Sequence, residues 1–137
     1  MSLVPERVSA GLLDTSVVID LPDVDPELLP ASVGICVVTL AELVAGPAAT
    51  TDPLERARRQ DRLQRVEATF DPMPFDAEAA RAYGLVYAAV VAAGRTPRRR
   101  LADLQIAAIA LANGLPLVTR NADDFVGLEG VLTIIAV

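Results

Sequence analysis

The sequence predicts an α/β fold in which helices cover both faces of a central, mainly parallel sheet. Apolar segments of strand length alternate along the chain with helical segments, and parallel strands need crossover connections of this kind. Hydrophobic residues make up 53% of the chain and aromatic residues only 4%, which suits closely packed helices on a sheet of branched side chains. The length of 137 residues is that of one ordinary domain, so we expect a single domain over residues 1–137.

The first quarter of the chain is expected to supply two strands. Residues 1–10 have no clear periodicity and are expected to form a loosely ordered lead-in. The apolar run Gly11–Asp14 predicts a strand, and Val17–Leu21 predicts a short helix. Three prolines within Pro22–Pro30 predict a loop with room for one helical turn. A buried strand is expected at Val33–Val38.

The middle of the chain is predicted to be mainly helical. Thr39 and Glu42 match the Thr-x-x-Glu capping box, which predicts a helix over Leu40–Val44 that Gly46-Pro47 ends. A second helix is expected over Leu54–Thr69. Its apolar stripe is imperfect and its charges are many, so this helix should lie on the surface.

Three further elements follow from local signals. Two prolines restrict Phe70–Phe75 to a short edge strand. Asp76 is a suitable N-cap for an alanine-rich helix over Ala77–Ala93, and Gly94 should end that helix. An arginine-rich loop follows at Arg95–Arg100.

The last third of the chain repeats the alternation of helix and strand. A helix is expected over Leu101–Ala112, ended by Asn113-Gly114. Buried strands should follow at Leu115–Thr119 and Val131–Ile135. These strands complete the predicted sheet.

The composition excludes several kinds of chemistry. The chain contains no histidine and one cysteine, Cys36, within an apolar run. Ser-His-Asp and Cys-His mechanisms and histidine-ligated zinc are therefore excluded, and Cys36 is expected to be a small buried hydrophobic residue. Without a disulfide framework, a secretory signal or an apolar run of membrane-spanning length, we expect a soluble cytoplasmic protein that binds no membrane.

The net charge of −6 would by itself disfavour a nucleic-acid ligand. However, all twelve basic residues are arginines, and most fall in two clusters: Arg56, Arg58, Arg59, Arg62 and Arg65, and then Arg95, Arg98, Arg99 and Arg100. A negative net charge can therefore coexist with local basic patches.

Acidic residues follow the predicted strands or open the helices beside them. The residues concerned are Asp14, Glu42, Asp103 and Asp124. Each also has a purely structural explanation: Asp14 and Glu42 as helix caps, Asp103 as a first-turn acid favoured by the helix dipole, and Asp124 as a turn residue near Asn121. Only for Asp14 is the functional interpretation stronger than the structural one when each residue is taken alone.

Asp14 is the only charged residue within Gly11–Ile19, between segments that should be buried. A lone buried carboxylate is costly, and acids gathered at one edge of a sheet repel one another. A divalent cation resolves both problems. Oxygen ligands without histidine or thiolate select Mg²⁺ or Mn²⁺, and such an ion can promote phosphodiester hydrolysis.

Four segments in this order resemble the PIN-domain ribonucleases and, within them, the VapC toxins of VapBC toxin–antitoxin pairs. Each segment is weak evidence alone, but the four together span most of the chain from Gly11 onward. They are Leu12–Ile19 (LLDTSVVI), Thr39–Gly46 (TLAELVAG), Leu101–Ala108 (LADLQIAA) and Leu117–Phe125 (LVTRNADDF).

The resemblance implies a PIN-like α/β/α sandwich and a magnesium-dependent endoribonuclease that cuts transfer or ribosomal RNA. It makes Asp14, Glu42 and Asp103 metal-site carboxylates, with Asp14 and Asp103 as direct ligands and Glu42 positioning the attacking water or a second ion. It also implies a cognate VapB-type antitoxin as partner, and a toxin homodimer that joins the antitoxin in a heterotetramer or larger complex. An apolar composition in so short a chain also favours a covered surface.

This chain departs from the family pattern at the fourth acidic position. Many relatives have an aspartate where this chain has Asn121, and Asp124 is the alternative source of that charge. The departure leaves open whether one or two metal ions bind.

Hydroxyl and arginine side chains are secondary candidates. Thr15, Ser16 and Thr119 can hydrogen-bond a carboxylate or a phosphate, although hydroxyls at strand ends are more often caps. Arg98, Arg99 and Arg100 precede Asp103 directly and are candidates for binding the RNA backbone. The structural alternative for these arginines is a solvated loop.

Two other functions share some of these sequence features. A phospho-accepting receiver-like signalling domain is also small, acidic and magnesium-dependent, but it needs an acidic pair after the first strand and a lysine after the last. This chain has one aspartate there and no lysine. The second alternative is a catalytically inactive PIN-fold binding module, against which the intact Asp14, Glu42 and Asp103 argue.

Overall fold

The computed structural model describes residues 7–137, and its four strands form one sheet in the order β2-β1-β3-β4. All three strand pairings are parallel, with Leu12 opposite Gly34 on one side and Leu117 on the other. The predicted central parallel sheet is confirmed. The strands are β1 (Ala10–Leu13), β2 (Ser32–Gly34), β3 (Leu117–Thr119) and β4 (Ile134–Ala136).

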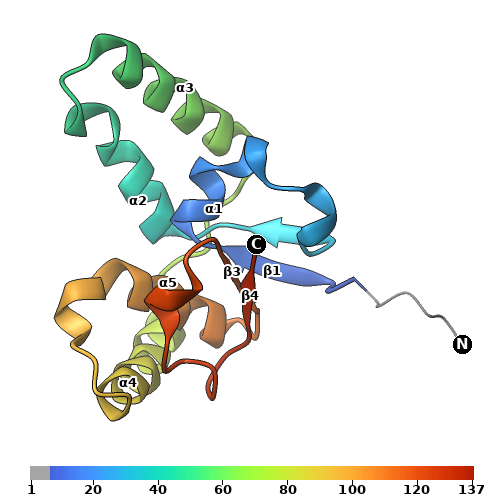
Figure 1. Cartoon of the computed structure of the whole chain (residues 1–137), viewed down its shortest axis with the longest axis vertical. Coiled ribbons are helices and arrows are strands. Elements are labelled where there is room, and N and C mark those ends of the chain that lie inside the picture. The colour runs from blue at the N-terminus through green and yellow to red at the C-terminus, as the bar shows by residue number, and fades with distance from the viewer. Residues whose placement is uncertain (1–6) are drawn as a thin grey trace, which may run out of the picture.

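Helices lie on both faces of the sheet (Figure 1). The α-helices are α1 (Thr15–Ile19), α2 (Val37–Ala45), α3 (Pro53–Thr69), α4 (Ala77–Ala92) and α5 (Leu101–Ala112). Short 3-10 turns lie between them: η1 (Leu21–Asp23), η2 (Pro26–Leu28), η3 (Pro47–Ala49), η4 (Pro97–Arg100) and η5 (Ala122–Phe125). None of the helices in the described part of the chain is long and apolar enough to cross a membrane.

Alternating residues of the central strands build two separate cores. Leu12 of β1 and Leu117 of β3 pack with α4 and α5 on one face. The next residues along the same strands, Leu13 and Val118, pack with α1, α2 and α3 on the other face. Successive side chains of a strand point to opposite faces, so this alternation confirms the three-layer α/β/α arrangement.

Local sequence signals predicted several helix ends correctly. The Asp76 side chain accepts a hydrogen bond from the Ala79 N–H at 2.9 Å and caps α4. Gly94 and Gly114 follow α4 and α5 with φ of 75° and 64°, a left-handed conformation that glycine adopts without steric cost.

The predicted start of α2 was wrong. The helix begins at Val37, three residues earlier than the capping box implies, and its N-cap is Cys36, which makes no side-chain capping bond. Val37 and Val38 therefore belong to the helix and not to the predicted strand Val33–Val38. The Thr39 hydroxyl is used in a tertiary hydrogen bond instead of a cap.

The predicted edge strand Phe70–Phe75 is reduced to one bridge, in which Met73 pairs in parallel with Cys36. Cys36 itself is fully buried, as expected. The loop Pro22–Pro30 contains one more turn than predicted, since η1 and η2 both lie near or within it.

The expected lead-in is only partly within the described residues, because residues 1–6 lie outside them. Residues 7–10 are held more firmly than the prediction implied. The Arg7 guanidinium donates to the carbonyls of Leu29 and Pro26 at 2.8 and 2.9 Å, and Ala31 N–H donates to Val8 O at 2.8 Å.

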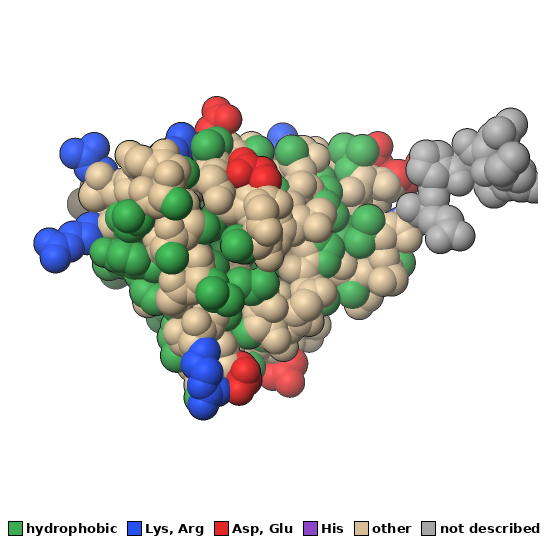
Figure 2. All heavy atoms as spheres, turned by 90° about the horizontal axis from the view of Figure 1, so that it is seen from below, with side chains coloured by type: hydrophobic (Ala, Val, Ile, Leu, Met, Phe, Trp, Pro, Cys, Tyr) green, Lys and Arg blue, Asp and Glu red, His purple; other side chains and the backbone are tan. Residues whose placement is uncertain are grey.

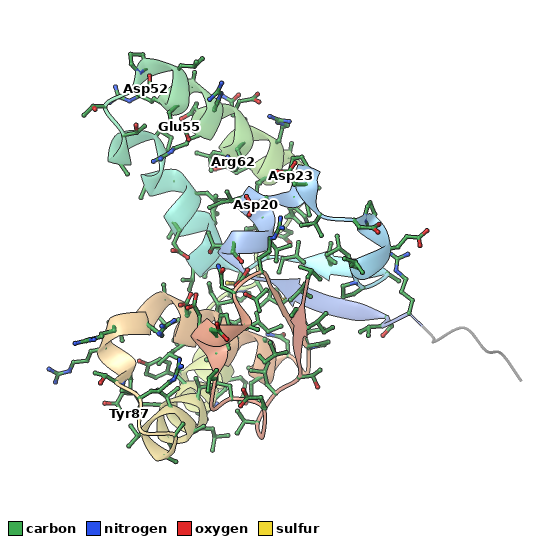
Figure 3. All side chains as sticks on the ribbon, in the orientation of Figure 1. Asp20, Asp23, Asp52, Glu55, Arg62 and Tyr87 are labelled. Carbon is green, nitrogen blue, oxygen red and sulfur yellow. The ribbon has the colours of Figure 1, made fainter. Side chains whose placement is uncertain are left out.

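The α2 and α3 helices extend away from the sheet as an arm (Figure 1). The labels Asp52, Glu55 and Arg62 mark the course of α3, and Tyr87 marks α4 at the other end of the molecule (Figure 3). The predicted surface position of α3 is confirmed, because only its second half is anchored, through the buried Leu63 and Val66.

Candidate active site

The sheet topology defines where a ligand can bind. The chain leaves β1 toward β2 on one side, while β3 lies on the other side of β1. In open parallel sheets, a crevice forms beyond the carboxyl ends of the strands where the strand order reverses in this way. Asp14 directly follows β1, and Thr119 ends β3 at this point.

Asp14 is both a helix cap and a buried carboxylate with two bound oxygens. Its side chain is 4% exposed. Oδ1 accepts hydrogen bonds from Ser16 Oγ at 2.6 Å and from the Val17 N–H at 3.1 Å. Oδ2 accepts from Thr119 Oγ1 at 2.5 Å. The structural and functional interpretations of Asp14 are thus compatible, because the cap fixes the carboxylate at the sheet edge.

Ser16 and Thr119 are themselves held by backbone groups of the segment after β3. The Arg120 N–H donates to Ser16 Oγ at 3.2 Å, and the Asn121 N–H donates to Thr119 Oγ1 at 3.0 Å. Each hydroxyl therefore accepts from the backbone and donates to Asp14, which fixes the direction of its proton. Ser16 and Thr119 therefore position the Asp14 carboxylate.

Glu42 is oriented by a pair of threonines. Thr15 Oγ1 donates to Glu42 Oε1 at 2.6 Å, and Thr39 Oγ1 lies 3.1 Å from Thr15 Oγ1. Since a hydroxyl has one proton and Thr15 gives it to Glu42, Thr39 is the donor to Thr15. Thr39 is fully buried. The exposed Glu42 carboxylate is thus oriented by two successive hydroxyl hydrogen bonds, the first of which comes from the buried Thr39.

The sequence analysis did not predict that Thr39 hydrogen-bonds Thr15 and so helps to orient Glu42. It assigned Thr39 as a helix cap. The available signal was its spacing from Glu42, because residues three apart on a helix lie on the same face.

Asp103, in the first turn of α5, carries the clearest electrostatic signature of the site. Burial, followed by the charges of Asp124, Asp14 and Glu42, raises its pKa from the ordinary value of 3.8 to about 6, while Arg100 acts in the opposite direction. The other three predicted carboxylates therefore lie close enough to Asp103 for their charges to act on it.

Asp124 and Arg100 form an ion pair between η5 and η4. The hydrogen bond to Asp124 raises the pKa of Arg100. A second arginine of the same loop, Arg95, donates to the Asp123 carbonyl at 2.8 Å. Arg98 and Arg99 are exposed in η4, and Asn121 is exposed directly before η5. The structure thus separates Arg100, which is paired, from its two solvated neighbours.

The donor set fits a hard divalent cation, because it consists of carboxylate and hydroxyl oxygens. Over residues 7–137, no three acidic or thiol side chains stand close enough together to form a ready-made metal cage. Mg²⁺ commonly uses one or two protein carboxylates and completes its shell with water. Asp14 and Asp103 are the residues that would hold it.

Replacing Thr119 by valine should destabilise the protein by roughly 1–3 kcal/mol, because Asp14 Oδ2 and the Asn121 N–H lose a buried partner. Urea unfolding in EDTA measures this effect. The matched control Thr119→Ser retains the hydroxyl and should stay close to the parent. Equal stability of the parent and the valine variant would contradict the role given to this hydrogen bond.

Comparison with known proteins agrees with this fold. The PIN domain matches residues 11–129. Ribonuclease VapC5 of Mycobacterium tuberculosis (strain ATCC 25618 / H37Rv) is 41% identical over 131 residues, which cover 92% of this chain and 93% of that protein.

Solved structures are similar as well. VapBC-5 from Mycobacterium tuberculosis, a member of the VapBC family of toxin–antitoxin systems, matches with a TM-score of 0.84 and 40% identity over 94% of this chain and 99% of that chain. FitAcB from Neisseria gonorrhoeae matches with a TM-score of 0.69 and 25% identity over 90% and 95% of the two chains. The chain therefore belongs to the PIN-domain family and, within it, to the VapC ribonucleases.

Proposed function

We propose that this chain is a magnesium-dependent endoribonuclease toxin, a single PIN-like nuclease domain over residues 1–137 that acts in the cytoplasm with an antitoxin. Mn²⁺ can replace Mg²⁺, and the substrates are transfer or ribosomal RNA. The observation that carries this proposal is the raised pKa of Asp103 beside Asp14, Glu42 and Asp124. So many carboxylates at one sheet edge are unfavourable unless a cation joins them.

In the proposed reaction Asp14 and Asp103 hold the ion, and the Thr15 hydroxyl orients Glu42 toward the attacking water. A bound Mg²⁺ supplies a more acidic water and offsets negative charge on the phosphate. The water oxygen bonds to phosphorus and the water gives up a proton, while the bond from phosphorus to the 3′-oxygen breaks and that oxygen takes up a proton. Arg98 and Arg99, with the paired Arg100, contact the RNA backbone.

RNA cleavage should stop in EDTA and return when Mg²⁺ or Mn²⁺ is added in excess. The products should carry 5′-phosphate and 3′-hydroxyl ends. End-labelled RNA and ligation-based mapping of the ends measure both, with Glu27→Gln, which removes an exposed acid of η2, as the control that should cut normally. Cleavage in EDTA, or a 2′,3′-cyclic phosphate end, would point to a different mechanism. A protein that binds RNA without cutting it would support the inactive binding module.

Two apolar surfaces support assembly with an antitoxin and with a second toxin chain. A groove of about 500 Å³ beneath α3 has an apolar floor that includes Val18, Leu21 and Phe70 and a rim that includes the α3 arginines Arg58 and Arg62. Figure 2 shows hydrophobic side chains gathered on the face that carries α4. Leu85, Tyr87 and Val91 of α4 are 61%, 41% and 51% exposed.

Expression of the chain alone in bacteria should arrest growth or give aggregated protein, because the active site and apolar surfaces are uncovered. Co-expression with its VapB-type antitoxin should restore growth and yield a complex of toxin dimers with antitoxin. Growth curves and light scattering measure the two effects. A toxin that is monomeric, soluble and harmless at high expression would contradict this part of the proposal.

A further inference from the structure

The four acids of the site differ in how their charges are compensated. Asp124 is in an ion pair with Arg100, and both side chains are about one-third exposed, at 35% and 36%. Asp14 and Glu42 accept hydrogen bonds from neutral hydroxyl and amide donors. Over residues 7–137, Asp14, Glu42 and Asp103 form no salt bridge with an arginine.

The Arg100–Asp124 pair is built into the fold at both ends. Arg100 is the last residue of η4, directly before α5, and Asp124 lies in η5. Arg95, two residues before η4, also donates to the Asp123 carbonyl of η5. The loop that leads into η4 is thus held against η5, and the planar Arg100 guanidinium loses little freedom when it pairs with Asp124.

From this pairing we infer that Arg100 serves as an internal cation for Asp124, so that the acidic site binds one divalent ion per chain and not two. The inference rests on the metal binding in the proposed function. Three uncompensated carboxylates can balance one divalent ion. A second ion would exceed their charge, and it would need Asp124, which Arg100 holds.

The neighbouring residue Asn121 gives no substitute charge. Its side chain is a neutral amide, and its backbone N–H is occupied by Thr119 Oγ1. One ion also satisfies the coordination that Mg²⁺ prefers, since one or two carboxylates and several waters complete its shell. Asp124 therefore stays paired with Arg100 at the edge of the site and holds no second ion.

Titration of the purified full-length chain with Mn²⁺, followed by electron paramagnetic resonance of the free ion, tests the inference by counting bound ions. The parent should bind one ion per chain. Arg100→Gln frees the Asp124 carboxylate and should bind two. Combining Arg100→Gln with Asp124→Asn should return the number to one, because both members of the pair are then neutral.

Two control variants separate the ion pair from a general effect of charge. Arg99→Gln removes one positive charge from the same turn, where Arg99 forms no salt bridge among the described residues. It should therefore still bind one ion. Arg100→Lys keeps the charge and should also bind one.

The possible outcomes distinguish this inference from the proposed function. Two ions in the parent would overturn the inference and leave the metal-dependent function intact, whereas no bound ion would overturn both. A single ion in Arg100→Gln, or two ions in Arg99→Gln, would show that pairing with Asp124 does not limit the number of ions.

Discussion

Replacing Asp103 by asparagine should stabilise the metal-free protein and abolish RNA cleavage. In the folded chain the pKa of Asp103 is raised from 3.8 to about 6. At neutral pH the ionised carboxylate therefore opposes folding by roughly 3 kcal/mol, since one pKa unit corresponds to about 1.4 kcal/mol. Asparagine removes the charge, and the shift in pKa already includes any favourable interaction of that charge with the α5 dipole. The gain of roughly 3 kcal/mol should raise the Tm in EDTA by several degrees.

The raised pKa of Asp103 makes the stability of the metal-free protein depend on pH. The unfolded chain releases the Asp103 proton near pH 4, whereas the folded chain retains it up to about pH 6. The metal-free parent therefore loses stability as the pH rises through this interval. Asp103→Asn has no titratable carboxyl group. The Tm of the variant should therefore exceed that of the parent by the full amount at pH 7.5, and the difference should vanish near pH 4. Melting curves of both proteins at the two pH values measure the difference.

Magnesium should reverse the order of the two proteins. A ligand that binds the folded state stabilises it in proportion to its affinity, so Mg²⁺ should raise the Tm of the parent more than that of Asp103→Asn. A variant that melts lower than the parent in EDTA, responds normally to Mg²⁺ and still cuts RNA would remove Asp103 from the active site. Glu27→Gln is again the matched control, because it removes an exposed carboxylate from η2.

The sheet could be predicted from the sequence because its signals are local. Strand-length apolar runs overlap all four strands, but the predicted strands at 33–38 and 131–135 share only two residues each with β2 and β4. Single residues such as Asp76 and Gly94 marked helix ends. The start of α2 could not be predicted in this way. Val37 and Val38 favour a strand by their branching, and Thr39 favours a cap, but packing against the core and the hydrogen bond to Thr15 place all three within the helix.

The site, like the fold, has residues that could be predicted from the sequence and contacts that could not. Asp14, Glu42 and Asp103 could be predicted as one group because the carboxyl ends of parallel strands meet at one edge, and the effect of the other two charges on the pKa of Asp103 supports that grouping. The partners of these acids could not. Thr119 and Asp14 are 105 residues apart, and Arg100 and Asp124 are 24 apart. Such contacts depend on tertiary packing, for which a single sequence has no periodic signal.

Asp14 should respond to substitution with the opposite sign from Asp103. Asp14→Ala removes the cap of α1, at a cost of about 1 kcal/mol. It also leaves the fully buried Thr119 hydroxyl without its acceptor at 2.5 Å, which costs a further 1–3 kcal/mol or so. The variant should therefore unfold at lower urea concentration than the parent in EDTA, by roughly 3 kcal/mol in total, and it should not cut RNA.

Asp14→Asn separates the two roles of the same side chain. Its amide oxygen can still accept from Ser16 and the Val17 N–H, so most of the cap should survive and the loss of stability should be smaller than in Asp14→Ala. The negative charge is absent, so cleavage and the stabilisation by Mg²⁺ should be lost equally in both variants. If Asp14→Ala were as stable as the parent in urea, the carboxylate would not hold the hydroxyls around it. If Asp14→Asn still cut RNA, Asp14 would be a structural cap alone, because capping requires an oxygen acceptor whereas holding a cation requires the charge.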